Sequence, residues 1–194
     1  MPGAVSISPE PAKPLVERKS LIGFRTACEQ VWGAPGLAAV HRGLPADVHE
    51  RTAGLQPLPK WIEVADLIAW HRAVWNGPAG HDEKLMIRHA RATVDQGFGR
   101  VKRFLLGIAT PHSLAPRVAA LWREEYSSGQ LTSARLEERG VELTLEDHPY
   151  VGDPLMRMVM GEVFRYVLSL TRARGVTVTY GLRGAALVVH LHWG

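Results

Sequence analysis

The stretch from Asp153 to Arg174 constrains the fold more than any other part of the sequence. Asp153 followed by Pro154 is a strong helix start, because aspartate can cap a helix and proline is tolerated at its first position. Gly175 marks the end of the predicted helix. A helix that is apolar around most of its circumference must be buried on two sides, and an ordinary central core helix is the simplest interpretation. The apolar positions are 155, 156, 158–160, 163, 164, 167, 168 and 170.

One of the two sides is expected to meet a sheet, because the segments around this helix alternate as strands do. Residues 131–138 and 141–146 are predicted to form one hairpin, and residues 176–182 and 185–193 a second. Upstream, the apolar spacing is helical. The order predicts an α+β fold, an N-terminal helical bundle followed by a β-β-α-β-β unit with a four-stranded antiparallel sheet and helices on one face. The helices are expected at about 20–33, 36–43, 45–54, 61–76, 82–96, 98–108 and 113–129.

Residues 1–19 differ from the rest of the chain in composition. They contain four prolines with glycine, serine and alanine, and few large apolar side chains. Such a segment cannot bury enough surface to offset its chain entropy, which predicts a flexible tail before a single domain at residues 20–194.

The overall composition is that of a soluble globular protein, with 46% hydrophobic and 22% charged residues in 194. The sequence has no apolar run long enough to span a membrane and lacks the features of a secretory signal, so a cytoplasmic protein is expected. The single cysteine, Cys28, lies in an apolar helical pattern and is predicted to be a buried, inert thiol. The net charge is +4, but the basic residues are interspersed with acidic ones, which does not favour nucleic-acid binding.

Tryptophan and methionine suggest where a ligand or a partner could bind. Trp61 and Trp70 are nine residues apart, close to half a turn out of phase, so one indole can line a pocket. Three methionines within five residues of the 153–174 helix supply flexible apolar surface. The candidate ligand-binding or interface residues are Trp61, Trp70, His71, Met156, Met160 and Phe164.

A second, weaker candidate is a metal site at the C-terminus. His190 and His192 are two residues apart on the last predicted strand, so both imidazoles project from the same face. A divalent metal would need a further ligand such as a carboxylate, and the sequence does not identify one.

Several short segments resemble a known family. They are Thr110-Pro111-His112-Ser113-Leu114 with Val118, Leu121-Trp122, Tyr126 and Ser128-Gly129, the elbow Pro59-Lys60-Trp61 before a helix, and the glycine-containing helix from Gly161 onward. They are similar to a myxobacterial family of proteins of this length and of unknown function, over about Leu21 to Trp193. That family resembles, distantly, the 4-vinyl-reductase-like and haem-nitric-oxide-binding folds, which serve as small-molecule sensors or interaction platforms.

The resemblance carries no functional residue over to this chain. Haem-binding relatives use a Tyr-x-Ser-x-Arg clamp, which Tyr126-Ser127-Ser128-Gly129-Gln130 does not supply. Other relatives carry a cysteine in the last hairpin turn, where this chain has Leu182-Arg183-Gly184-Ala185. The resemblance therefore implies a sensing fold in which haem is not expected, and the sequence requires no cofactor.

These observations predict a non-catalytic regulatory or sensory module that binds an apolar small molecule between the N-terminal helices and the 153–174 helix. The alternative is an interaction scaffold that forms a homodimer or docks a signalling partner through the same helix. A metal- or haem-dependent enzyme is the least favoured alternative, because neither paired carboxylates nor a nucleophile turn nor a complete dinucleotide motif stands out.

Overall fold

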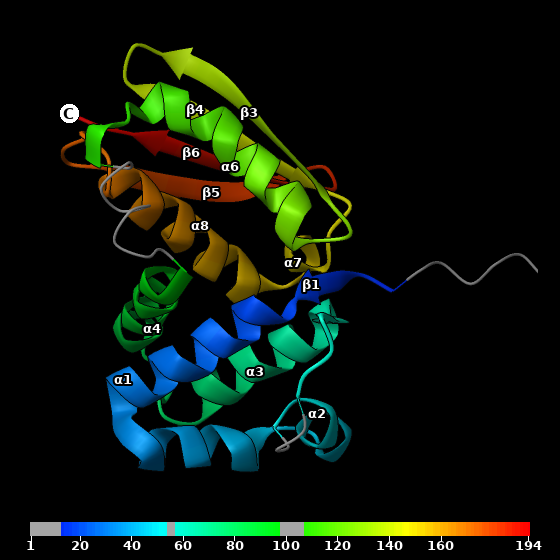
Figure 1. Ribbon diagram of the computed structural model, residues 1–194. Coiled ribbons are helices and arrows are strands. Elements are labelled where there is room, and N and C mark those ends of the chain that lie inside the picture. Colours follow the sequence, from blue (N-terminus) through cyan, green and yellow to red (C-terminus); the bar gives the residue numbers. More distant parts are fainter. Residues whose placement is uncertain (1–12, 54–56, 98–106) are drawn as a thin grey trace, which may run out of the picture.

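The computed structural model describes residues 13–53, 57–97 and 107–194. In this part of the chain a helical half lies against a second half that contains the main sheet (Figure 1). The order of elements confirms the α+β fold. The helix expected at 98–108 falls almost wholly outside the described residues. Among the residues described, no helix is long and apolar enough to cross a membrane.

The helical half contains one element that joins two expected helices. The segments expected at 20–33 and 36–43 are two helical segments that meet at a sharp kink, and together they are labelled α1. The kink lies at Gly33, whose φ of 70° and ψ of −177° are far from helical values and suit a residue without a side chain. Pro35, which has no N–H to donate, follows at the start of the second segment. The helices of this half are α1 (Arg18–Gly43), α2 (Ala46–Thr52), α3 (Val64–Asn76) and α4 (Glu83–Gly97).

A short ribbon beside these helices was not predicted from the sequence. In it, β1 (Leu15–Glu17) pairs antiparallel with β2 (Trp61–Glu63). Trp61 therefore begins a strand, and the helix expected from it starts instead at Val64. Local periodicity cannot reveal a pairing partner so distant in the chain, and here that partner overrides helix propensity. The pairing also brings residues 15–17, expected in the flexible tail, into the folded part.

β1 connects the two halves of the molecule. Val16 is fully buried and forms an isolated bridge with Tyr126, just after the first helix of the second half. The Ser127 backbone N–H donates to the Leu15 carbonyl at 2.9 Å, and the Leu15 N–H donates to Ser127 Oγ at 2.8 Å. One strand thus pairs with β2 and also holds residues 126 and 127.

The second half contains the two expected hairpins. They form one antiparallel sheet in the order β3-β4-β6-β5. The pairing β4–β6 places Leu143 opposite Val189, and both are buried on the covered face of the sheet. The strands are β3 (Gln130–Glu137), β4 (Gly140–Glu146), β5 (Thr177–Arg183) and β6 (Ala186–His192).

Two helices cover the same face of this sheet, as predicted. α6 (Pro111–Glu125) packs on β3 and β4, and α8 (Pro154–Ser169) packs on β5 and β6 (Figure 1). The short α7 (Pro149–Gly152) leads directly into α8. α6 begins before Ser113, because Thr110 and Ser113 form a reciprocal capping box around its first turn.

α8 is buried on two sides. One side packs on the sheet, and the other packs on α4 and α3. Every residue from 155 to 170 is buried or half-buried. The helix ends at Ser169 rather than near Arg174, because the Thr171 hydroxyl donates to the Leu168 carbonyl and accepts from the Ala173 N–H, which replaces helical bonds.

The side of α8 that faces α4 contains one buried carboxylate. Glu162 accepts hydrogen bonds from Arg91 Nε of α4 at 2.6 Å and from Arg165 Nη2 at 2.7 Å. Burial raises the pKa of Glu162, but the hydrogen bonds from Arg165 and Arg91 outweigh it and hold the pKa below its ordinary value. Glu162 is therefore ionised and paired, as a buried charge must be.

Candidate functional site

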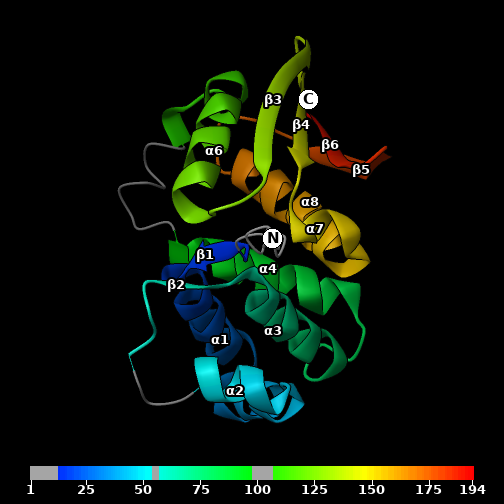
Figure 2. The same cartoon turned by 90° about the vertical axis from the view of Figure 1, so that its right-hand side faces the viewer.

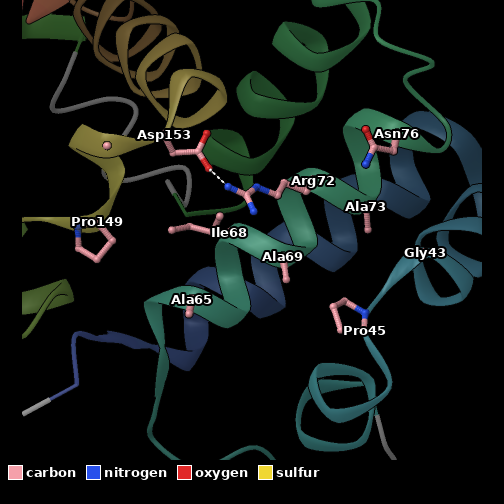
Figure 3. A pocket seen from close by; sticks show the side chains of 11 residues that line it. Gly43, Pro45, Ala65, Ile68, Ala69, Arg72, Ala73, Asn76, Pro149 and Asp153 are labelled. Carbon is pink, nitrogen blue, oxygen red and sulfur yellow. Dashed lines mark hydrogen bonds and ion pairs between the residues drawn. The ribbon is translucent and has the colours of Figure 1, made fainter.

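A surface groove lies where the two halves meet, between α3 and the junction of α7 and α8 (Figure 3). Its volume is about 470 Å³, within the range of small-molecule sites in proteins. It is lined by Gly43, Pro45, Ala65, Ile68, Ala69, Arg72, Ala73, Asn76, Pro149, Gly152 and Asp153. Small and apolar residues predominate, with charge concentrated at Arg72 and Asp153.

The groove exists because α3 has two different faces. Leu67, Trp70 and Val74 are buried on the inner face, where the Trp70 indole N–H donates to Thr52 Oγ1 at 2.8 Å. An adjoining face carries alanine at positions 65, 69 and 73, spaced about one helical turn apart. Side chains this short leave a hollow beside the helix, and Figure 3 shows them along its floor.

Arg72 and Asp153 join the two walls of the groove. Arg72 Nη2 lies 2.8 Å from Asp153 Oδ2, with the arginine side chain 62% exposed and the aspartate side chain 8% exposed. Asp153 Oδ1 accepts from the backbone N–H groups of Leu155 at 2.9 Å and Met156 at 3.3 Å. Asp153 is therefore the N-cap of α8, as the sequence predicts, and also the partner of an exposed guanidinium from the other half.

The residues predicted to bind a ligand do not line this groove. Trp70 and His71 lie on the buried face of α3, and Met156 and Met160 are buried in the core. Trp61 is half-buried in β2, with the Lys60 ammonium 5.6 Å from its ring centre. The groove lies between α3 and the start of the 153–174 helix, but small residues line it, whereas the predicted site residues are bulky. The spacing of Ala65, Ala69 and Ala73 was the available sequence signal.

Phe164 lies beside a different and much smaller space. It lines an internal void of about 10 Å³ between α6, α8 and the sheet, together with Leu114, Leu143 and other aliphatic residues. A void of that volume has room for about one water molecule, and its apolar lining offers a water no partners. It is a packing defect and not a ligand cavity.

A group of buried histidines occupies the core of the helical half. The Phe24 ring packs edge-on against His71, with centroids 4.6 Å apart, and against His89 at 4.3 Å. Burial lowers the pKa of His71 to about 3 and that of His89 to about 4, so both are neutral near pH 7. Cys28 Sγ lies 3.2 Å from His89 Nε2, and burial raises the pKa of the thiol to about 12. Cys28 is thus buried and protonated, as expected.

The structure supplies a carboxylate beside one of the two C-terminal histidines. Glu142 lies opposite His190 in the β4–β6 register, and Glu142 Oε2 is 2.9 Å from His190 Nε2. Arg183 also binds Glu142, at 2.7 Å, and lowers its pKa to about 2 together with His190. His192 instead lies opposite Gly140. Within the described ranges, no group of three or more His, Cys, Asp and Glu side chains is arranged to hold a metal ion.

Comparison with known proteins identifies the fold. No protein-family model and no curated protein sequence matches this chain. Among solved structures, 23 chains match, and several of them are H-NOX domains or proteins. The architecture of helices followed by a β-β-α-β-β unit is thus the H-NOX fold, the haem-nitric-oxide-binding-like architecture. At these low identities the likeness concerns the fold alone.

Three of the solved structures illustrate the match. A variant of Tt H-NOX has a TM-score of 0.64 at 9% identity, covering 91% of this chain and 94% of that one. The iron(II) unliganded H-NOX protein from K. algicida has a TM-score of 0.63 at 7% identity, covering 92% and 96%. An oxygen-binding H-NOX domain related to soluble guanylate cyclases has a TM-score of 0.59 at 9% identity, covering 89% and 92%.

Neither described cavity fits a haem. Protein ligands to haem iron are histidine, cysteine, methionine or tyrosine, and none of these lines the groove at Arg72. The internal void of about 10 Å³ is far too small for a porphyrin. The buried imidazoles of His71 and His89 pack directly against the ring of Phe24, and neither histidine lines the groove or the internal void. The residues described here therefore give no haem site at either place.

Proposed function

We propose that this chain is a non-catalytic sensory module that binds a small, mainly apolar molecule in the groove between α3 and the start of α8. The observation that carries the proposal is the position of the groove. It lies at the junction of the two halves of an H-NOX fold, and one wall comes from each half. Ligand sites favour such junctions, because a molecule bound there contacts both parts at once.

The lining indicates the chemistry of the ligand. The alanines, Ile68, Pro45 and Pro149 offer apolar contact. Arg72 uses one of its nitrogens toward Asp153 and leaves most of its side chain exposed at the mouth. A guanidinium has five N–H donors, so Arg72 can bind an acidic or carbonyl group of a ligand without leaving Asp153. A small apolar molecule with one oxygen-bearing end suits this arrangement.

The same contacts provide a way to report binding. Asp153 caps α8, and α8 packs on both halves. A ligand that binds Arg72 beside Asp153 weakens the ion pair between these two residues, which changes the electrostatic environment of the N-terminus of α8, where negative charge stabilises the helix. The signal would thus pass from the groove to the central helix without any chemical reaction.

The proposal can be tested with a bound molecule and with a probe. Native mass spectrometry of the purified protein should detect a co-purifying small molecule. The fluorescent anion anilinonaphthalene sulfonate should bind the groove, and Ala69→Trp should abolish that binding by filling it. Ala38→Trp, at an exposed position on α1, is the matched control and should bind the probe normally. Equal binding by both variants, with no co-purifying molecule, would contradict a ligand site in this groove.

The alternative of a scaffold that acts through the 153–174 helix finds less support. From residue 155 to residue 170 this helix presents no exposed side chain, because both halves of its own chain cover it. A partner or a second copy would need another surface.

A further inference from the structure

The two edges of the main sheet are protected unequally. The sheet ends in β3 on one side and β5 on the other. β3 has a register irregularity between Arg135 and Glu137. An irregularity of this kind hinders an edge strand from pairing with another chain. β5 reads TVTYGLR, with no proline, no register shift against β6 and no charge before its last residue, Arg183.

β5 is also unusually exposed for a strand with apolar residues. Six of its seven residues are exposed, including Tyr180 at 43% and Leu182 at 54%. Tyr180 lies opposite Val189 and Leu182 lies opposite Leu187, so both belong to the face of the sheet that α8 covers. The apolar face therefore continues past α8 to the edge. In Figure 2, β5 forms the right-hand border of the sheet, and no described element lies beyond it.

We propose that β5 pairs antiparallel with β5 of a second copy of this chain, which joins two four-stranded sheets into one of eight strands. A closed homodimer has a two-fold axis. When that axis is perpendicular to the sheet, the helix-covered faces of the two copies lie on the same side of the joined sheet. Side chains of directly opposite residues point to the same face, so their residue numbers must be both odd or both even. The register that pairs all seven residues then places Tyr180 opposite Tyr180 of the second copy.

The side chains of β5 are complementary to themselves in this register. On the helix-covered face, Val178 meets Leu182 of the second copy, and the two Tyr180 rings are neighbours. Apolar and aromatic cross-strand pairs of this kind stabilise a sheet. On the other face, Thr179 meets Gly181 and Thr177 meets Arg183. No like charges face each other, and each Arg183 remains bound to Glu142 of its own chain at 2.7 Å.

Cysteine cross-linking of the full chain tests both the dimer and its register. Directly opposite Cα atoms in an antiparallel pair are about 4.5–5.5 Å apart, within the reach of a disulfide. Tyr180→Cys should therefore form a covalent dimer rapidly under mild oxidation. Leu182→Cys is the matched control, because its copy would lie four residues further along, on the order of 14 Å away. The native Cys28 is buried and should not contribute.

Sedimentation of the wild-type protein provides the second measurement. The protein should associate from monomer to dimer as its concentration rises, and Tyr180→Lys should remain a monomer with an unchanged circular dichroism spectrum. Three results would overturn the proposal: a wild-type monomer at every concentration, a dimer that persists in Tyr180→Lys, or faster cross-linking at position 182 than at 180. None of these outcomes depends on the ligand groove.

Discussion

Arg72 of the helical half reaches across the groove to Asp153, the residue that caps the central helix of the other half, with Nη2 and Oδ2 2.8 Å apart. Asp153 thus has two roles at once, one in the local structure of α8 and one in joining the halves. The two roles can be separated by mutation.

Asp153→Ala should lower the free energy of unfolding by about 1–2 kcal/mol, the usual cost of losing an N-cap. Arg72→Ala should cost less, about 0–1 kcal/mol, because its guanidinium is largely exposed and the ion pair is weakened by water. Denaturant titration of both variants and of the double mutant measures the coupling. A cost for Arg72→Ala as large as that for Asp153→Ala would show that the ion pair and not the cap is the main contribution.

Phe164→Ala should lower the free energy of unfolding by about 3–5 kcal/mol, the range for removing an enclosed aromatic side chain. The ring is 5% exposed and packs where α6, α8 and the sheet meet. Chemical denaturation measures the loss. A loss below about 1 kcal/mol would indicate that Phe164 faces an interface or a pocket instead of the core.

Gly161→Ala should destabilise the protein by about 1–3 kcal/mol through overpacking. A Cβ atom at this position would lie 2.6 Å from Cδ1 of Tyr180, so the ring or the helix must shift. Gly152→Ala is the matched control, because a Cβ there meets nothing within 4 Å. Thermal unfolding of the two variants compares them directly, and equal melting temperatures would rule out the close contact.

Acid should unfold the protein through its buried histidines. Burial lowers the folded-state pKa of His71 to about 3 and those of His89 and His148 to about 4, from an ordinary value of 6.5. At a pH between the folded-state pKa and 6.5, each of these histidines binds more protons in the unfolded state than in the folded state. The free energy of unfolding therefore falls as the pH drops below about 6.5, and it keeps falling until the pH reaches the folded-state pKa values. Each group contributes up to about 1.4 kcal/mol per pH unit.

Urea titrations between pH 8 and pH 5 measure this dependence. The slope should approach about 4 kcal/mol per pH unit for three such groups. His71→Leu should remove about one third of the slope while keeping a buried side chain at that position. An unchanged slope in this variant would mean that His71 titrates normally in the folded state.

Cys28 should resist thiol reagents until the protein unfolds. It is fully buried, and burial raises its pKa to about 12, so almost no thiolate exists at neutral pH. Colour development with a disulfide reagent should be slow in buffer and immediate in denaturant. Rapid labelling of the native protein would show that the interior of the helical half opens readily.

The sequence predicted most of the second half because its signals are local. Asp153 and Pro154 marked the start of α8, and the alternating pattern gave both hairpins nearly to the residue. The two-sided burial of α8 followed from its composition. β1 could not be found in this way, since its strand character depends on residues 61–63 far along the chain.

The candidate site was harder to predict for a physical reason. This groove forms where the side chains are small, whereas the hydrophobic pattern of a sequence identifies large buried residues such as Trp70 and Met156. The carboxylate beside His190 could not be predicted either, because Glu142 becomes the neighbour of His190 only through the β4–β6 register.

The short strand at Leu15–Glu17 has a consequence for the order in which the chain can fold. Its backbone is held on one side by residues 61–63 and on the other by Ser127, 112 positions after Leu15. During synthesis, residues 15–17 leave the ribosome long before Ser127 exists. The side of β1 that later contacts Ser127 therefore stays unpaired until that residue has been made. Contacts this distant in sequence are slow to close. The contacts of residues 15–17 can therefore be completed only after Ser127 has been synthesised.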